Sequence, residues 1–313
     1  MPASDHRLTT IEMAHFAHDG FLRFDALVPP ELNTAVLDEL PALEEAKLAP
    51  FLGVEPAVAT PATSTPLSGY RTGTALGEVF ALPALRGIIE SLVGADPVFD
   101  HDFVHHLRPS SGERQHLHPD AIVDTTDPSF DIQVFYFPHD VRPGEGGTRF
   151  VPGSHLRRTT STATAALQHV VGDQRFAGPA GTVLVFHHGL WHAGDDNPSD
   201  RHRWMVKVRL NPVVPQVRLW NLDDFDAVHN DHTDHIFATS RPDSVAAVFR
   251  RPHPWQSVDA QRYDLVERIR LWRYLSGDPT FDADYYLTRH EHRLARTGMA
   301  AAHDAVGSAG AGS

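Results

Sequence analysis

The chain has 313 residues, of which 41% are hydrophobic and 21% are charged, a balance typical of a folded globular protein with one large or two small domains. A formal net charge of −13 disfavours nucleic acid and anionic membranes as partners, because both attract basic surfaces. Since the chain has no cysteine, it holds no disulfide, zinc–thiolate site, iron–sulfur cluster or thiol nucleophile.

No targeting or membrane segment is evident. The N-terminal residues lack an apolar stretch suited to a signal peptide, and no hydrophobic run approaches membrane-spanning length. We therefore expect a cytoplasmic protein with no membrane partner.

The N-terminal quarter predicts helices. Thr9 and Glu12 have the spacing of a capping box, which predicts a short helix ending at Gly20, followed by a strand over 21–27. A second helix is expected to begin at the proline pair before Glu31 and to run to about residue 44. Residues 49–75, rich in Pro, Ala, Thr and Gly, predict a long loop, and a helix over 83–94 follows.

From residue 97 onward, apolar residues recur with a period of two, which predicts strands. Short strands that follow one another without matching helices favour a barrel or a sandwich. The predicted strands are 97–107, 131–137, 148–151, 182–186 and 202–210.

The C-terminal part returns to helical patterns. Helices are predicted over 258–276 and around 281–296. The small, polar residues 298–313 predict a disordered tail.

A candidate metal centre begins at His118-Pro119-Asp120. Residues two apart lie on the same face of an extended chain, so the imidazole and the carboxylate can reach one metal ion. His192, directly after an apolar strand, is the best third ligand. Two histidines and one carboxylate leave three coordination positions open, as in non-haem Fe(II) oxygenases. A bare His-x-Asp spacing is common by chance, so the hypothesis depends on the second histidine and on an arginine beyond it.

That arginine is Arg203. It shares one face of the predicted strand 202–210 with Met205, Lys207 and Arg209. If this face lines a barrel, Arg203 can bind a carboxylate with two hydrogen bonds; if the face is solvated, Arg203 pairs with a surface acid. Alternation alone leaves both interpretations open.

Three motifs in this order resemble the phytanoyl-CoA dioxygenase-like (PhyH) family of Fe(II)/2-oxoglutarate-dependent oxygenases. They are HLHPD (116–120), GEGGTRFVPGSH (144–155) and WHAGDDNPSDRHR (191–203), and the resemblance covers roughly residues 10–212. It implies a mainly β fold with flanking α: a double-stranded β-helix, which is a jelly-roll or cupin-like barrel. We accordingly expect an oxygenase domain with N-terminal helices over 1–212, a helical C-terminal extension over 213–297 that packs on the barrel, and a tail over 298–313.

The resemblance also implies roles for individual residues. His118, Asp120 and His192 become the catalytic iron ligands, and Arg203, eleven residues past His192, matches the arginine that binds the distal carboxylate of 2-oxoglutarate. The cofactors implied are Fe(II), 2-oxoglutarate as cosubstrate and O₂. Related halogenases replace the carboxylate ligand with a small residue, so Asp120 favours hydroxylation or a related oxidation over halogenation.

Further residues follow from the same resemblance. Gln133 and Phe135 lie on a strand that borders the cosubstrate pocket in such enzymes. Gly194 stands where relatives often have a small hydroxyl residue that helps to bind the cosubstrate, so this chain departs from the family there. His155, in the PGSH turn, is expected to be structural.

Two other functions stay open. A cupin-type metalloenzyme would use His116, His118 and His192 without Asp120 and without 2-oxoglutarate, although the glutamate expected after the His-x-His pair is missing. A non-catalytic barrel that binds a ligand is the second alternative. The substrate is expected to be a small molecule, possible substrates include those of secondary metabolism, and the sequence leaves both its identity and homo-oligomerisation open.

Overall fold

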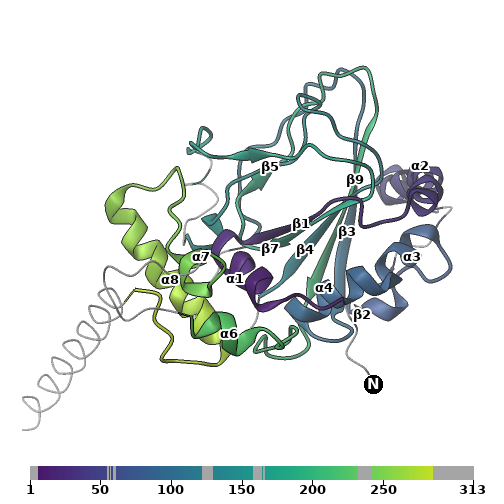
Figure 1. Cartoon of the computed structure of the whole chain (residues 1–313). Helices are drawn as coiled ribbons and strands as arrows, with labels where there is room; N and C mark the ends of the chain where they lie inside the picture. Colours follow the sequence, from purple (N-terminus) through teal and green to yellow (C-terminus); the bar gives the residue numbers. More distant parts are fainter. Residues whose placement is uncertain are drawn as a thin grey trace, which may run out of the picture.

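The computed structural model describes residues 6–54, 56, 58, 61–121, 130–157, 164, 166–231 and 242–284, with the backbone alone for residues 50 and 258–261. Two antiparallel sheets form its centre (Figure 1). The larger has the order β1-β7-β4-β9-β3-β2 and the smaller the order β6-β5-β8. The strands of the larger sheet are β1 (Phe21–Phe24), β2 (Thr65–Pro66), β3 (Val98–Leu107), β4 (Ile132–Phe137), β7 (Thr182–His187) and β9 (Arg203–Asn211), and those of the smaller are β5 (Arg149–Phe150), β6 (Gln174–Arg175) and β8 (His192–Ala193).

The two faces of the larger sheet have different neighbours. On β4, Val134 and Tyr136 pack into a large core shared with the helices, whereas Phe135 and Phe137 pack on the other face. There they join Phe150 of the smaller sheet in a second cluster between the sheets. Two antiparallel sheets that enclose such an interior form the double-stranded β-helix that the motifs imply.

The N-terminal helices confirm part of the prediction. Helix α1 (Thr10–Asp19) begins at the predicted capping box, with both of its hydrogen bonds present, and ends at Gly20, whose φ of +77° suits glycine. Helix α4 (Pro83–Val93) also lies where it was expected.

The loop predicted over 49–75 begins too early, because residues 49–52 are helical. Helix α2 (Pro30–Leu52) runs eight residues beyond the expected end near residue 44 and ends at Gly53 in the left-handed conformation. Ala46 and Ala49 are buried in its last turns. Alanine is a good helix former, which favours the longer helix. A short 3₁₀ helix, η1 (Leu67–Gly69), and helix α3 (Ala75–Ala81) follow.

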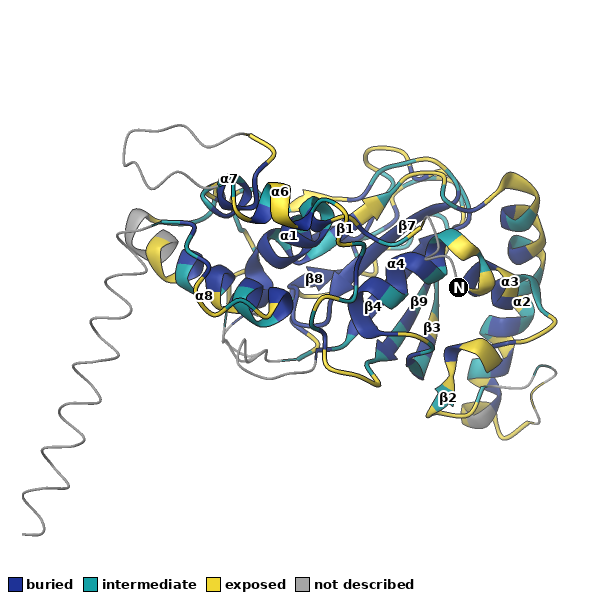
Figure 2. Ribbon diagram, turned by 60° about the horizontal axis from the view of Figure 1, so that its bottom comes forward, coloured by how far each residue is buried: buried dark blue, intermediate teal, exposed yellow. Residues whose placement is uncertain are grey.

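The C-terminal region is helical. It contains α6 (Phe225–His229), α7 (Val245–Phe249) and α8 (Val258–Ser276), the last of which matches the predicted helix over 258–276. Helix α1 contacts both α7 and α8, and α8 contacts the 3₁₀ helix η2 (Ser154–Leu156). The buried sides of these helices face the rest of the molecule (Figure 2). Residues 281–284 are not helical, and the rest of the helix predicted around 281–296, with the tail over 298–313, lies outside the described residues. Among the described helices, none is long and apolar enough to cross a membrane.

Candidate active site

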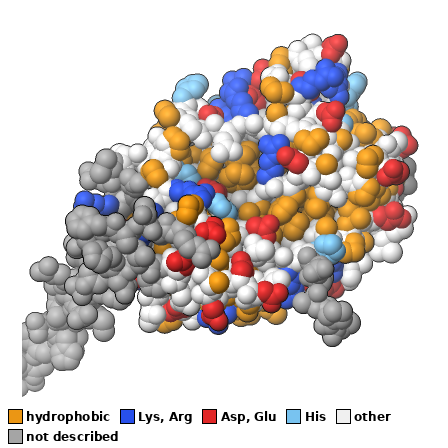
Figure 3. Space-filling view, in the orientation of Figure 1, with side chains coloured by type: hydrophobic (Ala, Val, Ile, Leu, Met, Phe, Trp, Pro, Cys, Tyr) orange, Lys and Arg blue, Asp and Glu red, His pale blue; other side chains and the backbone are white. Residues whose placement is uncertain are grey.

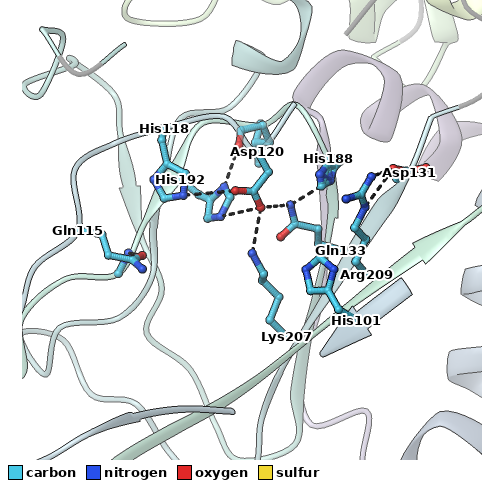
Figure 4. Close-up of polar contacts among 12 residues, drawn as sticks. His101, Gln115, His118, Asp120, Asp131, Gln133, His188, His192, Lys207 and Arg209 are labelled. Carbon is cyan, nitrogen blue, oxygen red and sulfur yellow. Dashed lines mark hydrogen bonds and ion pairs between the residues drawn. The ribbon is translucent and has the colours of Figure 1, made fainter. Parts of the chain in front are cut away.

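His118, Asp120 and His192 come together at the edge of the smaller sheet. His118 and His192 form a β-bridge, with backbone N–H···O distances of 3.0 and 2.9 Å. Asp120 then approaches both rings: its Oδ1 lies 3.4 Å from Nε2 of His118 and its Oδ2 lies 3.7 Å from Nε2 of His192. The three donor atoms lie within 4.8 Å of one another (Figure 4). The predicted triad is therefore a single cluster.

Backbone carbonyls fix the tautomers of both imidazoles. Nδ1 of His118 lies 2.7 Å from the carbonyl oxygen of His116, and Nδ1 of His192 lies 2.9 Å from that of Leu190. A carbonyl only accepts hydrogen bonds, so each Nδ1 carries the proton and each Nε2 turns a lone pair toward Asp120. Two imidazole nitrogens and one carboxylate, with the opposite ring nitrogens held by carbonyls, fit a divalent iron ion.

Electrostatics keep His192 and Asp120 in the protonation states that a metal needs. Burial lowers the pKa of His192 to about 3, so this imidazole is neutral near pH 7. Burial alone would raise the pKa of Asp120, but the adjacent side chains of His118, His192 and Lys207 hold it well below its usual range. The carboxylate is consequently ionised, and its proximity raises the pKa of His118.

Two residues on the barrel side of the larger sheet contact the Asp120 carboxylate. The side-chain nitrogen of Gln133 lies 2.5 Å from Oδ2, and Nζ of Lys207 lies 2.9 Å from the same oxygen. Phe135, two residues past Gln133, lies edge-on to His192 with ring centroids 5.5 Å apart. Gln133 and Phe135, expected beside the cosubstrate pocket, therefore lie beside the triad (Figure 4 labels Gln133).

Arg203 points into the barrel, which decides the question that alternation left open. It is buried and lies on the same strand face as Met205, a member of the cluster between the sheets. Its Nη2 donates to the carbonyl oxygen of Asp195 at 3.2 Å, whereas its Nη1 is buried and has no acceptor within the described part of the chain. Burial lowers the pKa of Arg203 to about 10, although Asp195 and Asp196 act in the opposite direction. A buried cation with a spare donor is suited to a ligand carboxylate.

Sequence reasoning missed the contact of Lys207 with Asp120, and His105 lies close to the same lysine. Both are on inward strand faces: His105 of β3 is opposite Met205 of β9. Burial, together with the charges of Lys207 and Arg203, lowers the pKa of His105 to about 4, so it is a neutral neighbour of these cations. The period-two pattern that identified Arg203 also marks Lys207, since the two lie four residues apart on one strand.

The remaining residues from the sequence motifs lie at other places. The His116 side chain is exposed, and His116 is absent from the metal-ligand clusters found among the described residues. His155 is buried under α1, where its Nε2 hydrogen-bonds the carbonyl oxygen of Ala17. The backbone N–H of Gly194 donates to Oε1 of Gln115 at 2.8 Å, and a Cβ at position 194 would lie 3.1 Å from that oxygen. Gln115 thus occupies the space into which a larger residue at position 194 would extend.

The face of the molecule seen in Figure 1 has hydrophobic side chains gathered across its middle, with basic and acidic groups around them (Figure 3). Phe103, on the inward side of β3, is 47% exposed. Nζ of Lys47 and Nζ of Lys207 lie 5.0 and 5.6 Å from the centre of its ring. An exposed aromatic ring thus lies next to the side chain that contacts Asp120.

Comparison with known proteins agrees with this geometry. A crystal structure of EctD from S. alaskensis in its apoform superposes with a TM-score of 0.51 and 18% identity, covering 67% of this chain and 79% of that one, which supports the fold. An L-proline trans-4-hydroxylase from Streptomyces griseoviridis is 27% identical over 165 residues, covering 42% of this chain and 61% of the hydroxylase. The dioxygenase cdmA from Talaromyces verruculosus is 30% identical over 114 residues, covering 34% of this chain and 37% of cdmA.

The chain therefore spans less than two thirds of the length of these two curated relatives. A family model, described as phytanoyl-CoA dioxygenase (PhyH), matches residues 16–205, which is more than half of the chain. This range contains the triad, Arg203 and both sheets apart from the last part of β9. The chain belongs to the phytanoyl-CoA dioxygenase (PhyH) family.

Proposed function

We propose that this protein is a non-haem Fe(II)- and 2-oxoglutarate-dependent dioxygenase that hydroxylates an unactivated C–H bond of a small molecule. One observation carries the proposal: two imidazoles and a carboxylate converge inside a barrel whose wall also holds a buried arginine, and the Nη1 of this arginine has no acceptor among the described residues. A divalent metal ion and a dicarboxylate cosubstrate match these two sets of groups.

In this proposal His118, Asp120 and His192 hold the iron, and Arg203 binds the distal carboxylate of 2-oxoglutarate. When bound, Fe(II) with 2-oxoglutarate and O₂ supplies the oxidising power for C–H cleavage, while the cosubstrate is converted into succinate and CO₂. Gln133 orients the Asp120 carboxylate, and Phe135 fixes the plane of the His192 ring. The phenylalanines between the sheets exclude water from the reacting atoms.

Two observations favour hydroxylation over other outcomes. Asp120 supplies a carboxylate where halogenases have a small residue. The relative from Streptomyces griseoviridis is named a proline hydroxylase. We also propose that the substrate belongs to secondary metabolism, so compounds of this class are the first to assay.

The test begins with anaerobic calorimetric titration of the protein with Fe(II) and then with 2-oxoglutarate. Addition of O₂ should next yield succinate, faster in the presence of the correct member of a substrate panel, with a product one oxygen atom heavier. Asp120→Asn should weaken Fe(II) binding at least about 100-fold, because it removes the anionic ligand of the triad.

His116→Ala is the matched control, since it changes an exposed histidine next to the triad and should leave Fe(II) binding intact. Loss of Fe(II) binding in His116→Ala with retention in Asp120→Asn would favour a cupin-type site. Failure of the wild-type protein to bind either Fe(II) or 2-oxoglutarate would favour a non-catalytic barrel.

A further inference from the structure

A second group of metal-ligand side chains lies at the end of α1, outside the barrel. His18, Asp19 and His253 each offer a donor atom, and these atoms lie within 4.8 Å of one another. His18 and Asp19 end α1, whereas His253 lies in the segment between α7 and α8. His15, one turn earlier on α1, places its Nδ1 3.6 Å from Oδ2 of Asp19.

The histidines of this group repeat the hydrogen-bonding pattern of the triad. Nε2 of His18 lies 3.0 Å from the carbonyl oxygen of Arg251, and Nδ1 of the same ring lies within hydrogen-bond distance of Oδ1 of Asp19, at 2.7 Å. His253 hydrogen-bonds the backbone of His18. Its Nε2 is buried, has no hydrogen-bond partner within the described part of the chain, and lies 3.8 Å from Oδ1 of Asp19.

The unpartnered Nε2 of His253 and the carboxylate of Asp19 thus face each other at the end of α1. A cation between them would accept both a ring lone pair and a carboxylate oxygen.

We infer that His18, Asp19 and His253 form a structural Zn²⁺ site that fastens the segment before α8 to the end of α1. Ligands of a tetrahedral zinc ion lie about 3.3 Å apart. Oδ1 of Asp19 lies 2.7 Å from Nδ1 of His18 and 3.8 Å from Nε2 of His253, and these distances bracket that value. Two imidazoles and one carboxylate supply three of the four tetrahedral positions, which leaves the fourth to a water molecule.

The surroundings restrict the His253 side of the site. A Cβ at Gly153, where φ is +76°, would lie 2.4 Å from Nε2 of His253, so only glycine leaves room for this ring. The guanidinium of Arg268 donates to the carbonyl oxygens of Phe249 and Arg251 and so holds the segment that carries His253. Arg268 is also a nearby positive charge, which both Asp264 and Asp19 stabilise.

The experiment removes the triad first. In the full-length His118→Ala/Asp120→Ala variant, loading with Zn²⁺ and dialysis against a weak chelator should leave about one zinc per chain by elemental analysis. Zn²⁺ should also raise the Tm of this variant by about 5 °C, because a metal that binds only the folded state stabilises it. Co²⁺ in place of Zn²⁺ should give the visible absorption bands of tetrahedral coordination.

His253→Gln, added to the same background, should abolish the bound zinc, the Tm shift and the cobalt bands while keeping the fold. His229→Gln is the matched control: His229 is also a buried histidine beside a carboxylate, 2.9 Å from Asp278, and this change should leave one zinc per chain. In an otherwise wild-type chain, His253→Gln should retain Fe(II) in the triad, so the outcome is independent of the oxygenase proposal. Absence of zinc retention and of a Tm shift in the triad-free variant, or equal retention after His253→Gln, would overturn the inference.

Discussion

Asp120 and Asp19 are each approached by two imidazoles whose remaining ring nitrogens are held by the backbone, but the two carboxylates differ in what lies around them. Asp120 lies between two sheets, and it also contacts Lys207 and Gln133. Asp19 lies at a helix end, where a third histidine, His15, completes its surroundings. On our proposals, the first centre keeps coordination positions for the cosubstrate and O₂, whereas the second links two segments of the chain. Similar donor sets would then serve chemistry in one place and stability in the other.

The largest effect is expected at Arg203, which we propose binds 2-oxoglutarate in the Asp120 centre. Arg203→Met should raise the KM for 2-oxoglutarate about 10- to 150-fold, the equivalent of the about 1.5–3 kcal/mol contributed by hydrogen bonds to charged groups. Methionine keeps the buried volume and removes a buried charge, so the fold should remain intact. Steady-state kinetics with varied 2-oxoglutarate provides the measurement.

Arg201→Gln serves as the comparison for Arg203. Arg201 lies two residues away, near the surface, where its Nη1 is 3.4 Å from Glu145. Its substitution should leave the KM for 2-oxoglutarate unchanged. Equal effects of the two substitutions would show that Arg203 does not bind the cosubstrate.

The burial of the region around Asp19 is tested by the pH dependence of the unfolding free energy, through the neighbouring His155. Burial lowers the pKa of His155 to about 3, below the ordinary value of 6.5 in the unfolded chain. Between these values the unfolded state binds one more proton, so stability falls as pH decreases through this window. The slope is at most about 1.4 kcal/mol per pH unit for this group. His155→Gln should remove the contribution of this ring to the slope. The unfolding free energy that is lost between pH 6.5 and 5 should therefore be about 2 kcal/mol smaller in the variant than in the wild type.

Denaturant unfolding at the two pH values measures this difference. His116→Gln, at an exposed histidine, should retain the wild-type slope. If His155→Gln also retains the wild-type slope, the His155 ring is protonated in the folded protein. The region around Asp19 is then more accessible to water than its packing indicates.

The smallest effect is expected at Lys207, the cation that distinguishes the Asp120 centre. A unit charge and a divalent ion about 5 Å apart repel by about 6 kcal/mol at an effective dielectric of 20. Solvent and the lost Lys207–Asp120 pair offset most of this, so we expect Lys207→Met to bind Fe(II) about 10-fold more tightly. Lys47→Met is the control, because Lys47 pairs with Asp102 instead. Weaker Fe(II) binding in Lys207→Met would mean that the lysine chiefly positions Asp120.

The sequence was most informative where a local pattern has one physical meaning. The capping box at Thr9 and the helix over 258–276 could be predicted because caps and helical periodicity act over a few residues. The inward position of Arg203 could not, since alternation defines two faces without telling which one is buried. The contact of Lys207 with Asp120 joins residues 87 positions apart, and no local spacing encodes it.

The same reasoning explains the errors. The end of α2 was misplaced because Ala and Pro near residue 50 resemble a loop in composition, while the burial of Ala46 and Ala49 cannot be read from composition. The group around Asp19 was also overlooked. His18 and His253 are separated by more than 200 residues, and a chain with 22 histidines gives no single one much weight.

The exposed Phe103 ring next to Lys47 and Lys207 has a practical consequence. These are the only two lysines in the chain, which otherwise relies on arginine for positive charge. An amine-selective acylating reagent will consequently label, apart from the α-amino group, just the rim around Phe103. The rate of that labelling then reports whether a bound molecule covers the surface around Phe103, without any mutation or added reporter group.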